Sequence, residues 1–309
     1  MIKQLFVIFL FSLGTTLFAQ QPTIQEKLGF PKTTKLLIIH ADDLGVAHSE
    51  NSATIKAMES AVVNSASIMV PTPWFTEIAS YAVANPKSDF GLHLTVTSEW
   101  KNYKWGPLSD KQKVPGLVNK NGFLFSSADS VYQKATPAEI EKELRYQIEK
   151  ALSFGIDVTH FDSHMAVLYN NAEYLKVLIR LGREFKVPVM LSKTGVRSAI
   201  RMSIDSFLTE KDVLVDAIYS AGPADFKKGM DQFYTGLLKT MNPGVNIFII
   251  HTAYDDKEMQ AITIDHPDWG AAWRQADYDF FTSEKARQLL KENNIQLITW
   301  REIRDKLLR

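Results

Sequence analysis

Residues 36–43, LLIIHADD, join a run of branched apolar side chains to two consecutive carboxylates. A short apolar run that ends in polar residues is typical of a buried β-strand. Runs of similar length and composition recur at residues 66–70, 91–96, 158–161, 187–191, 246–250 and 296–299. We therefore expect about seven short strands in this chain.

Amphipathic helices are expected between these strands. The clearest begins at Thr136-Pro137-Ala138-Glu139, which supplies an N-cap, a proline at the first helical position and the glutamate of a capping box. Gly155 is placed to end this helix, and a second helix is expected over residues 283–293. Residues 100–130 show no clear period, so we expect a long loop or a small hairpin there.

The alternation of strands and helices determines the expected fold class. It favours parallel strands joined by right-handed crossovers. About seven such units predict an α/β fold, a closed or nearly closed (β/α) barrel, with a doubly wound open sheet as the competing topology. No repeat or linker interrupts the chain, so we expect a single domain over residues 20–309.

Composition excludes several classes of protein. The 309 residues are 45% hydrophobic and 23% charged, which excludes intrinsic disorder. Lysine and arginine together number 35, as do aspartate and glutamate, so the chain lacks the basic excess that nucleic-acid binding requires and no nucleic-acid partner is expected. Cysteine is absent, so any bound metal must be held by nitrogen and oxygen atoms.

The N-terminus has the pattern of an export signal. Lys3 precedes an apolar run over residues 5–13, and the small residue Ala19 follows. We expect a signal peptide over residues 1–19 that is cleaved after Ala19, and hence a secreted or periplasmic protein; an uncleaved anchor is the alternative. No later segment is long enough to span a bilayer, so no stable membrane insertion is expected. A homodimer is left open.

Titratable side chains lie at the ends of, or inside, four of the expected strands: Asp42 and Asp43, His93, Asp162 and His164, and His251. In a parallel barrel the C-terminal strand ends open onto one face, so these groups should meet around one pocket. Two imidazoles and one carboxylate form the ligand set of a catalytic divalent ion that keeps a position open for water. Such an ion lowers the pKa of a bound water and polarises a carbonyl oxygen.

The proton transfers of such a reaction need further groups. The adjacent pair Asp42-Asp43 offers one carboxylate to the metal and one to the proton of the attacking water. His251, from another strand, could protonate the departing amine. A turn or a helix N-cap is the structural explanation for the same aspartate pair.

Four motifs carry a resemblance to a known family: HADDLG at 40–45, FGLHLTV at 90–96, HFDSHM at 160–165 and IIHTA at 249–253. In this order and spacing they resemble the YdjC-like carbohydrate deacetylases, the group that contains chitooligosaccharide deacetylase and the hopanoid-associated deacetylases. The resemblance runs from about Lys35 to Glu302. It implies an irregular (β/α) barrel and a polysaccharide deacetylase-like hydrolase.

The resemblance also implies roles for individual residues. It makes Asp43, His93 and His164 the ligands of one divalent ion, zinc or magnesium, and Asp42 the catalytic base. The two aspartates could exchange these roles. His251 takes the place of the histidine that acts on the leaving group.

Two departures from the family pattern fall on the substrate side. Many relatives read D-S-H-x-H, where this chain has Ala166, and many place an arginine where this chain has residues 189–191. Both weaken the transfer of substrate identity more than that of the metal site.

Further residues are candidates for contacts around the site. Trp100 and Trp105 offer aromatic faces for a sugar ring, although a cluster that anchors the loop explains them as well. Arg274 could clamp a carboxylate or form part of a pocket wall. Asp162 could orient a ligand histidine from outside the metal's own shell, whereas His160 is expected to pack rather than to act.

These observations predict a metal-dependent hydrolase that acts on a linear amide C–N bond. It would remove N-acetyl groups from an acetylated mono- or oligosaccharide. The alternative is an exported carbohydrate-binding barrel that has lost catalysis. A metal-dependent isomerase or phosphoesterase would need more carboxylate ligands or a glycine-rich phosphate loop, and the sequence shows neither.

Overall fold

The computed structural model describes residues 22–193 and 204–309. The expected signal peptide over residues 1–19 lies outside the described residues, so its cleavage after Ala19 stays a prediction.

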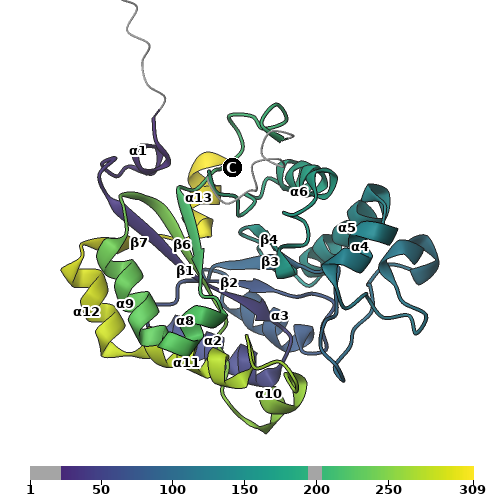
Figure 1. Cartoon of the computed structure of the whole chain (residues 1–309). Helices are drawn as coiled ribbons and strands as arrows, with labels where there is room; N and C mark the ends of the chain where they lie inside the picture. The colour runs from purple at the N-terminus through teal and green to yellow at the C-terminus, as the bar shows by residue number, and fades with distance from the viewer. Residues whose placement is uncertain (1–21, 194–203) are drawn as a thin grey trace, which may run out of the picture.

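Seven parallel strands curve into a half-barrel at the centre of the chain (Figure 1). The strands are β1 (Lys35–Leu44), β2 (Ser65–Ile68), β3 (Phe90–Leu94), β4 (Phe161–Ser163), β5 (Ala217–Ser220), β6 (Gly244–Ile250) and β7 (Ile295–Leu297). Their order across the sheet is β4-β3-β2-β1-β6-β5, and β7 pairs with β1 outside this path. The prediction of an irregular, single-domain α/β barrel with about seven parallel strands is confirmed.

Helices surround the sheet, with α9, α11 and α12 on one flank and α4, α5 and α6 on the other (Figure 1). The helices are α1 (Ile24–Leu28), α2 (His48–Ser60), α3 (Phe75–Ala84), α4 (Ala128–Lys134), α5 (Pro137–Ser153), α6 (Ala172–Phe185), α8 (Pro223–Lys228), α9 (Met230–Thr240), α10 (Lys257–Ile262), α11 (Ala271–Thr282), α12 (Glu284–Glu292) and α13 (Trp300–Leu307). Within residues 22–193 and 204–309, none of them combines the length and apolar character that a membrane span needs.

The most buried strand is β1, which explains why its sequence is apolar on both faces. It pairs with β6 along its first seven residues, from Lys35 to Ala41. Its other edge is divided between β7, which pairs with the start of the strand, and β2, which pairs with its end. Because neighbours cover both edges and both faces, nearly every residue of β1 is buried.

Two expected strands differ from the structure. The strand expected at 158–161 begins only at Phe161. The run at 187–191 makes single bridges rather than a ladder: Val189 pairs with Phe161, and Ser192 with Val215. Pro188 lies in this run and has no N–H to donate, which prevents a regular ladder. The segment nevertheless lies between β4 and the approach to β5, where it partly closes the barrel.

The helix boundaries agree with the capping signals. Thr136 Oγ1 accepts a hydrogen bond from the Glu139 N–H, and the Glu139 carboxylate accepts one from the Thr136 N–H, which completes the capping box of α5. Gly155 follows this helix with φ 89°, a left-handed conformation. Helix α12 begins after Ser283, as expected.

The long segment after β3 is held in place by a buried side chain of α5. It contains two short 3₁₀ turns, Lys111–Lys113 and Pro115–Leu117, and one antiparallel bridge between Val118 and Leu124. Glu143 of α5 is fully buried and accepts hydrogen bonds from the backbone N–H groups of Leu108 and Ser109, each at 2.9 Å. This loop is therefore fixed to α5 beside the end of the barrel.

Candidate active site

The end of β1 presents two aspartates to the same cavity. The parallel register with β2 is broken between Ala41 and Leu44, and Asp43 takes a left-handed conformation with φ 67°. Aspartate tolerates this conformation better than most residues. Gly45 follows with φ 96°, and a Cβ there would lie only 3.1 Å from the Met69 carbonyl oxygen. This irregular turn lets Asp42 and Asp43, on consecutive positions, both line one cavity.

Asp43 lies at the centre of the site. Its Oδ1 is 3.3 Å from His93 Nε2 and 3.1 Å from His164 Nδ1. The three side chains come from β1, β3 and the 3₁₀ turn His164–Ala166 after β4, and each is at most 4% exposed. One ligand atom from each lies within 4.8 Å of the others. The structure therefore brings together the three residues predicted as metal ligands.

Each of the two imidazoles is held from behind by a second carboxylate. His93 Nδ1 lies 3.0 Å from Asp162 Oδ1, and His164 Nε2 lies 3.0 Å from Glu99 Oε2. Each ring thus directs one nitrogen at Asp43 and the other at an outer carboxylate. Metal-binding histidines are commonly oriented in this way, because the outer carboxylate fixes the tautomer of the ring.

Asp42 and His251 form a pair beside this centre. Asp42 Oδ1 is 3.1 Å from His251 Nε2, and the His251 backbone N–H donates a hydrogen bond to Asp277 Oδ2 at 2.9 Å. Burial, together with the Asp43 carboxylate, raises the pKa of Asp42 to about 8. Burial and the Arg274 guanidinium lower the pKa of His251 to about 3, so its imidazole is neutral at pH 7.

Asp43 remains ionised for a different reason. Burial by itself would raise the pKa of Asp43, but the Arg274 guanidinium and the two imidazoles hold it well below its usual range. Arg274 donates to Asp43 Oδ2 at 2.7 Å and to Glu50 Oε1 at 2.5 Å. Arg274, expected to clamp a carboxylate or to form part of a pocket wall, lines the cavity and is already bonded to two carboxylates of the protein.

Acidic groups outnumber basic ones around the site. Arg274 forms ion pairs with two of the nearby carboxylates, Asp43 and Glu50. In all, five carboxylates lie in or directly behind the site: Asp42, Asp43, Glu50, Glu99 and Asp162. Buried carboxylates without a partner are costly, so they must take up protons or share a cation. The nitrogen and oxygen donors fit a small divalent ion such as zinc or magnesium.

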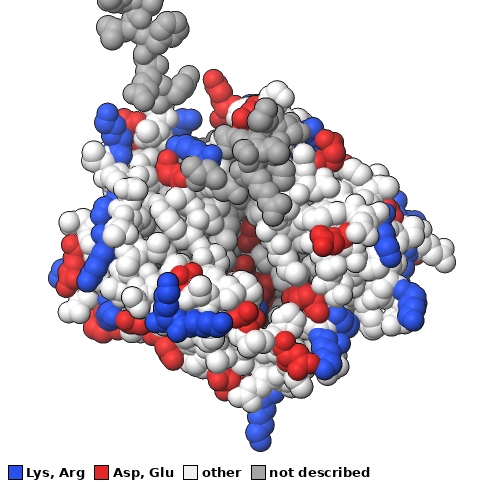
Figure 2. Space-filling view, viewed as in Figure 1, with Lys and Arg blue, Asp and Glu red and all other residues white. Residues whose placement is uncertain are grey.

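A cavity of about 830 Å³ opens above these residues. Figure 2 shows acidic side chains gathered in the central hollow of this face. The cavity walls also carry exposed apolar side chains, among them Met165 and Trp269, which are 45% and 38% exposed. A floor of carboxylates and imidazoles with apolar walls is typical of a small-molecule site.

The predicted substrate-binding residues have different positions. Trp100 lines the cavity, although only 3% of it is exposed. Trp105 is buried beside it, does not line the cavity, and donates its indole N–H to the Thr97 carbonyl at 2.9 Å. A direct contact of Trp105 with substrate stays a prediction, and its position indicates packing.

Sequence reasoning missed several residues of this site, notably Glu50, Glu99, Met165 and Trp269. Glu99 lies one residue before the predicted Trp100, and Glu50 lies in the first turn of α2, seven residues after Asp43. Neither residue directly follows a strand, whereas the sequence prediction relied on titratable residues at strand ends. Glu50 could have been predicted, because it is an acidic residue at a helix position that faces the protein interior.

Comparisons with known proteins agree with the geometry. The family described as YdjC-like protein matches residues 36–292. The carbohydrate deacetylase of Thermus thermophilus is 28% identical, over 91% of this chain and 98% of that protein. The carbohydrate deacetylase of Thermoanaerobacter pseudethanolicus is 26% identical, over 86% of this chain and 98% of that protein.

A solved structure shares the fold. It is described as a putative cellobiose-phosphate cleavage protein from Enterococcus faecalis V583, with a TM-score of 0.72 and 22% identity. The match covers 86% of this chain and 98% of that one.

Proposed function

This chain belongs to the YdjC-like protein family, and from that premise we propose that it is a metal-dependent carbohydrate deacetylase that hydrolyses the N-acetyl group of an amino sugar. Relatives of the same length that are carbohydrate deacetylases support an enzyme acting on a sugar amide. The observation that carries the metal-dependent mechanism is the convergence of Asp43, His93 and His164 beside the Asp42–His251 pair at the floor of one cavity.

The proposed metal ligands are Asp43, His93 and His164. The contacts support this assignment, because Asp43 lies within 3.3 Å of both imidazoles, whereas Asp42 lies 3.7 Å from His93 and closer, at 3.1 Å, to His251. A divalent ion held there would lower the pKa of a water and polarise the acetamide carbonyl. The excess of carboxylates supplies the negative charge that such an ion balances.

Asp42 is proposed as the base that takes a proton from the attacking water, and His251 as the acid that protonates the departing amine. The two groups lie 3.1 Å apart at the floor of the cavity. The pKa of Asp42 is about 8 in the metal-free chain, and a divalent cation beside it would lower this pKa so that the carboxylate can accept a proton at pH 7. His251 is neutral at pH 7 and must take up a proton before it can donate one to the amine.

The cavity supports an uncharged or amine-bearing saccharide as substrate. Among its described lining residues Arg274 is the one lysine or arginine, and Asp43 and Glu50 already occupy it. A phosphorylated sugar would meet acidic groups and, among the lining residues that the structure describes, no unpaired lysine or arginine to bind its phosphate. Apolar walls that include Trp269 suit the apolar face of a sugar ring.

Secretion or periplasmic location, with cleavage after Ala19, remains part of this proposal on the pattern of residues 1–19 alone. The mass of the N-terminus of protein purified from its natural host tests it. The catalytically inactive sugar-binding barrel is the alternative, and it gives no reason for a base, an acid and a ligand set to meet in one cavity.

The test is acetate release from N-acetylglucosamine oligomers by the purified protein, before and after chelation and after zinc or magnesium is restored. We expect chelation to abolish release, the added ion to restore it, and H93A to remain inactive under all three conditions. Undiminished release from H93A or from metal-free protein would refute the mechanism. Sugar binding without any release in the metal-loaded wild type would favour the inactive barrel.

A further inference from the structure

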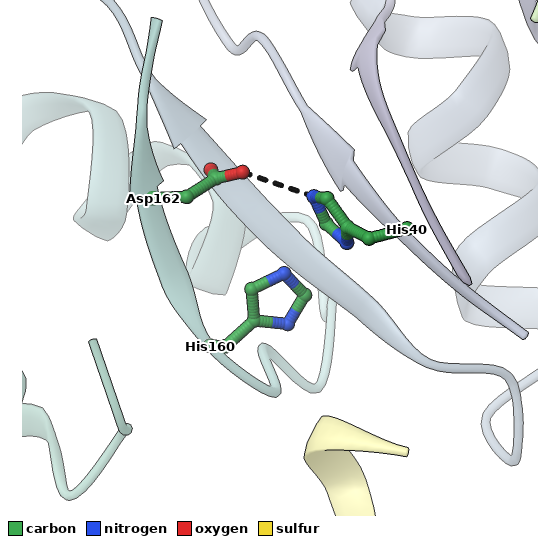
Figure 3. Close-up of side chains that lie close together, drawn as sticks. All are labelled: His40, His160 and Asp162. Atoms are coloured by element: carbon green, nitrogen blue, oxygen red, sulfur yellow. Dashed lines mark hydrogen bonds and ion pairs between the residues drawn. The ribbon is translucent and has the colours of Figure 1, made fainter. Parts of the chain in front are cut away.

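A second cluster of two histidines and one aspartate lies behind the candidate metal site. Figure 3 shows His40, His160 and Asp162 close together, with the Asp162 carboxylate directed at the His40 ring. His40 and His160 are fully buried and Asp162 is 3% exposed. Neither of the two histidines lines the cavity, so this cluster does not face substrate.

Asp162 connects this cluster with the candidate metal site. Its Oδ2 lies 3.0 Å from His40 Nε2 and accepts a hydrogen bond from Ser67 Oγ at 2.8 Å. Its Oδ1 lies 3.0 Å from Nδ1 of His93. His40 is itself held, because its Nδ1 lies 2.9 Å from Ser65 Oγ.

The residues that connect His40 with His93 lie on four adjacent strands of the sheet. His40 lies on β1, Ser65 and Ser67 on β2, His93 on β3 and Asp162 on β4, which are four neighbours in the strand order. His40 is the registered partner of Ser65, and His93 that of Asp162. The contacts between these side chains are therefore fixed by the register of the barrel.

His160 has a different environment from His40. Its ring stacks on Trp300 with centroids 5.3 Å apart and meets His40 edge-on at 4.8 Å. A Cβ at Gly91 would come within 2.6 Å of the His160 ring, so the glycine leaves the space that this ring fills. His160 Nε2 has no hydrogen-bond partner among the described residues. It packs against His40, and the described residues show no hydrogen bond or ion pair between His160 and Asp162.

A second metal ion is the competing explanation for three such residues. Both ring nitrogens of His40 are already engaged, by Ser65 on one side and by Ser67 and Asp162 on the other. Asp162 uses its remaining oxygen toward His93. A cation would have to displace these contacts in a place that the cavity does not reach, so support of the first site explains the cluster better.

We propose that His40 is a positioning residue of the metal centre, which acts by holding Asp162 so that His93 directs Nε2 at Asp43. In the tautomer in which Ser65 Oγ donates to Nδ1, His40 donates from Nε2 to Asp162. His40 and Ser67 then both donate to Oδ2, which fixes the rotation of the carboxylate and holds Oδ1 3.0 Å from His93 Nδ1. This inference rests on the proposed metal-dependent function.

The experiment measures zinc affinity by competition with a chromogenic chelator, and the visible absorption spectrum of the cobalt-substituted protein, for wild type, H40L and H160L. H160L is the matched control, because His160 is equally buried, is adjacent in space and lacks the contact with Asp162. We expect H40L to bind zinc about tenfold more weakly, the lower end of the effect of outer partners of a metal ligand, with an altered cobalt spectrum. H160L should stay within about twofold of wild type.

Two further variants keep the test decisive if H40L does not fold. S67A removes the other donor to Asp162 and should weaken zinc binding by about threefold, while H40Q retains a donor and should bind more tightly than H40L. Wild-type affinity in folded H40L or in S67A, or an equal loss in H160L, would overturn the role of His40 and leave the proposed function intact. Failure of the wild type to bind zinc, cobalt or magnesium would overturn both.

Discussion

The two buried clusters contain the same kinds of residue and differ in their surroundings. Asp43, His93 and His164 face a cavity, and each imidazole directs one nitrogen at the same carboxylate oxygen. In the cluster of His40, His160 and Asp162, both nitrogens of His40 are bonded to protein groups, and the two rings are fully buried outside that cavity. The composition of a cluster therefore does not identify a metal site. Access to the cavity distinguishes the two, because Asp43, His93 and His164 line it and His40 and His160 do not.

The largest effect is expected for Asp42, which lies on the cavity side and is proposed as the base rather than as a metal ligand. We expect D42N to lower kcat for acetate release by about a hundredfold to ten thousandfold, the usual contribution of a general base, while zinc affinity changes by less than about threefold. Zinc titration and steady-state kinetics on the same preparation measure both quantities.

Restored turnover in D42N at high pH would show that solvent hydroxide replaces the missing base. A zinc affinity reduced as much as in H93A would instead make Asp42 a ligand, and the roles of the two aspartates would have to be exchanged.

Asp277 is a buried carboxyl group outside both clusters, so its protonation can be tested without changing either cluster. Burial is the main cause that raises its pKa to about 7, although it accepts hydrogen bonds from the His251 N–H and the Tyr234 hydroxyl. The folded protein thus holds a proton that the unfolded chain releases near pH 4. The free energy of unfolding should fall as the pH rises from about 4 to about 7, by a few kcal/mol from this group alone.

Urea denaturation of wild type and D277N across this pH range measures the effect. The asparagine does not titrate, so the variant should show a smaller decline in stability than wild type. Parallel pH profiles for the two proteins would contradict the raised pKa.

The smallest expected effect concerns the cavity wall. Trp269 is 38% exposed, has φ 57°, and stacks on Trp273 with centroids 5.0 Å apart. We expect W269A to raise KM for an N-acetylated oligosaccharide by about five- to tenfold with little change in kcat, because aromatic contacts are worth about 1 kcal/mol. Trp74 is also 38% exposed but lies outside the cavity, so W74A is the control.

An unchanged KM in W269A would remove this side chain from the substrate contacts. An equal rise in W74A would attribute the effect to general loss of exposed tryptophan.

Much of the fold could be predicted from the sequence because the barrel strands are short, apolar and bounded by polar residues. β1 and β6 were found in this way, since both are buried along almost their whole length. β5 was missed because Asp216 leaves it an apolar run of only three residues, 217–219, which are half-buried rather than buried. The run at 187–191 has the composition of a strand, but its pairing depends on the spacing between β4 and β5, which local sequence does not contain.

The candidate site, too, was predicted where local sequence determines it and missed where it depends on contacts between distant segments. Side chains at strand ends could be predicted because parallel strands deliver them to one rim. Glu99 could not, since its contact with His164 depends on how the loop after β3 folds back. The engagement of Arg274 by Glu50 and Asp43 joins residues more than 200 positions apart, and no local pattern records it.

The contact between His160 and Trp300 has a consequence for the order in which the protein matures during synthesis. Trp300 begins the last helix, and β7, just before it, pairs with the first strand of the barrel. The floor beneath the histidines is therefore incomplete until the final residues have left the ribosome. A chain that ends before Trp300 would contain all the proposed ligands but lack the residues that pack beneath them, so we expect the proposed ion to bind only after this segment has folded.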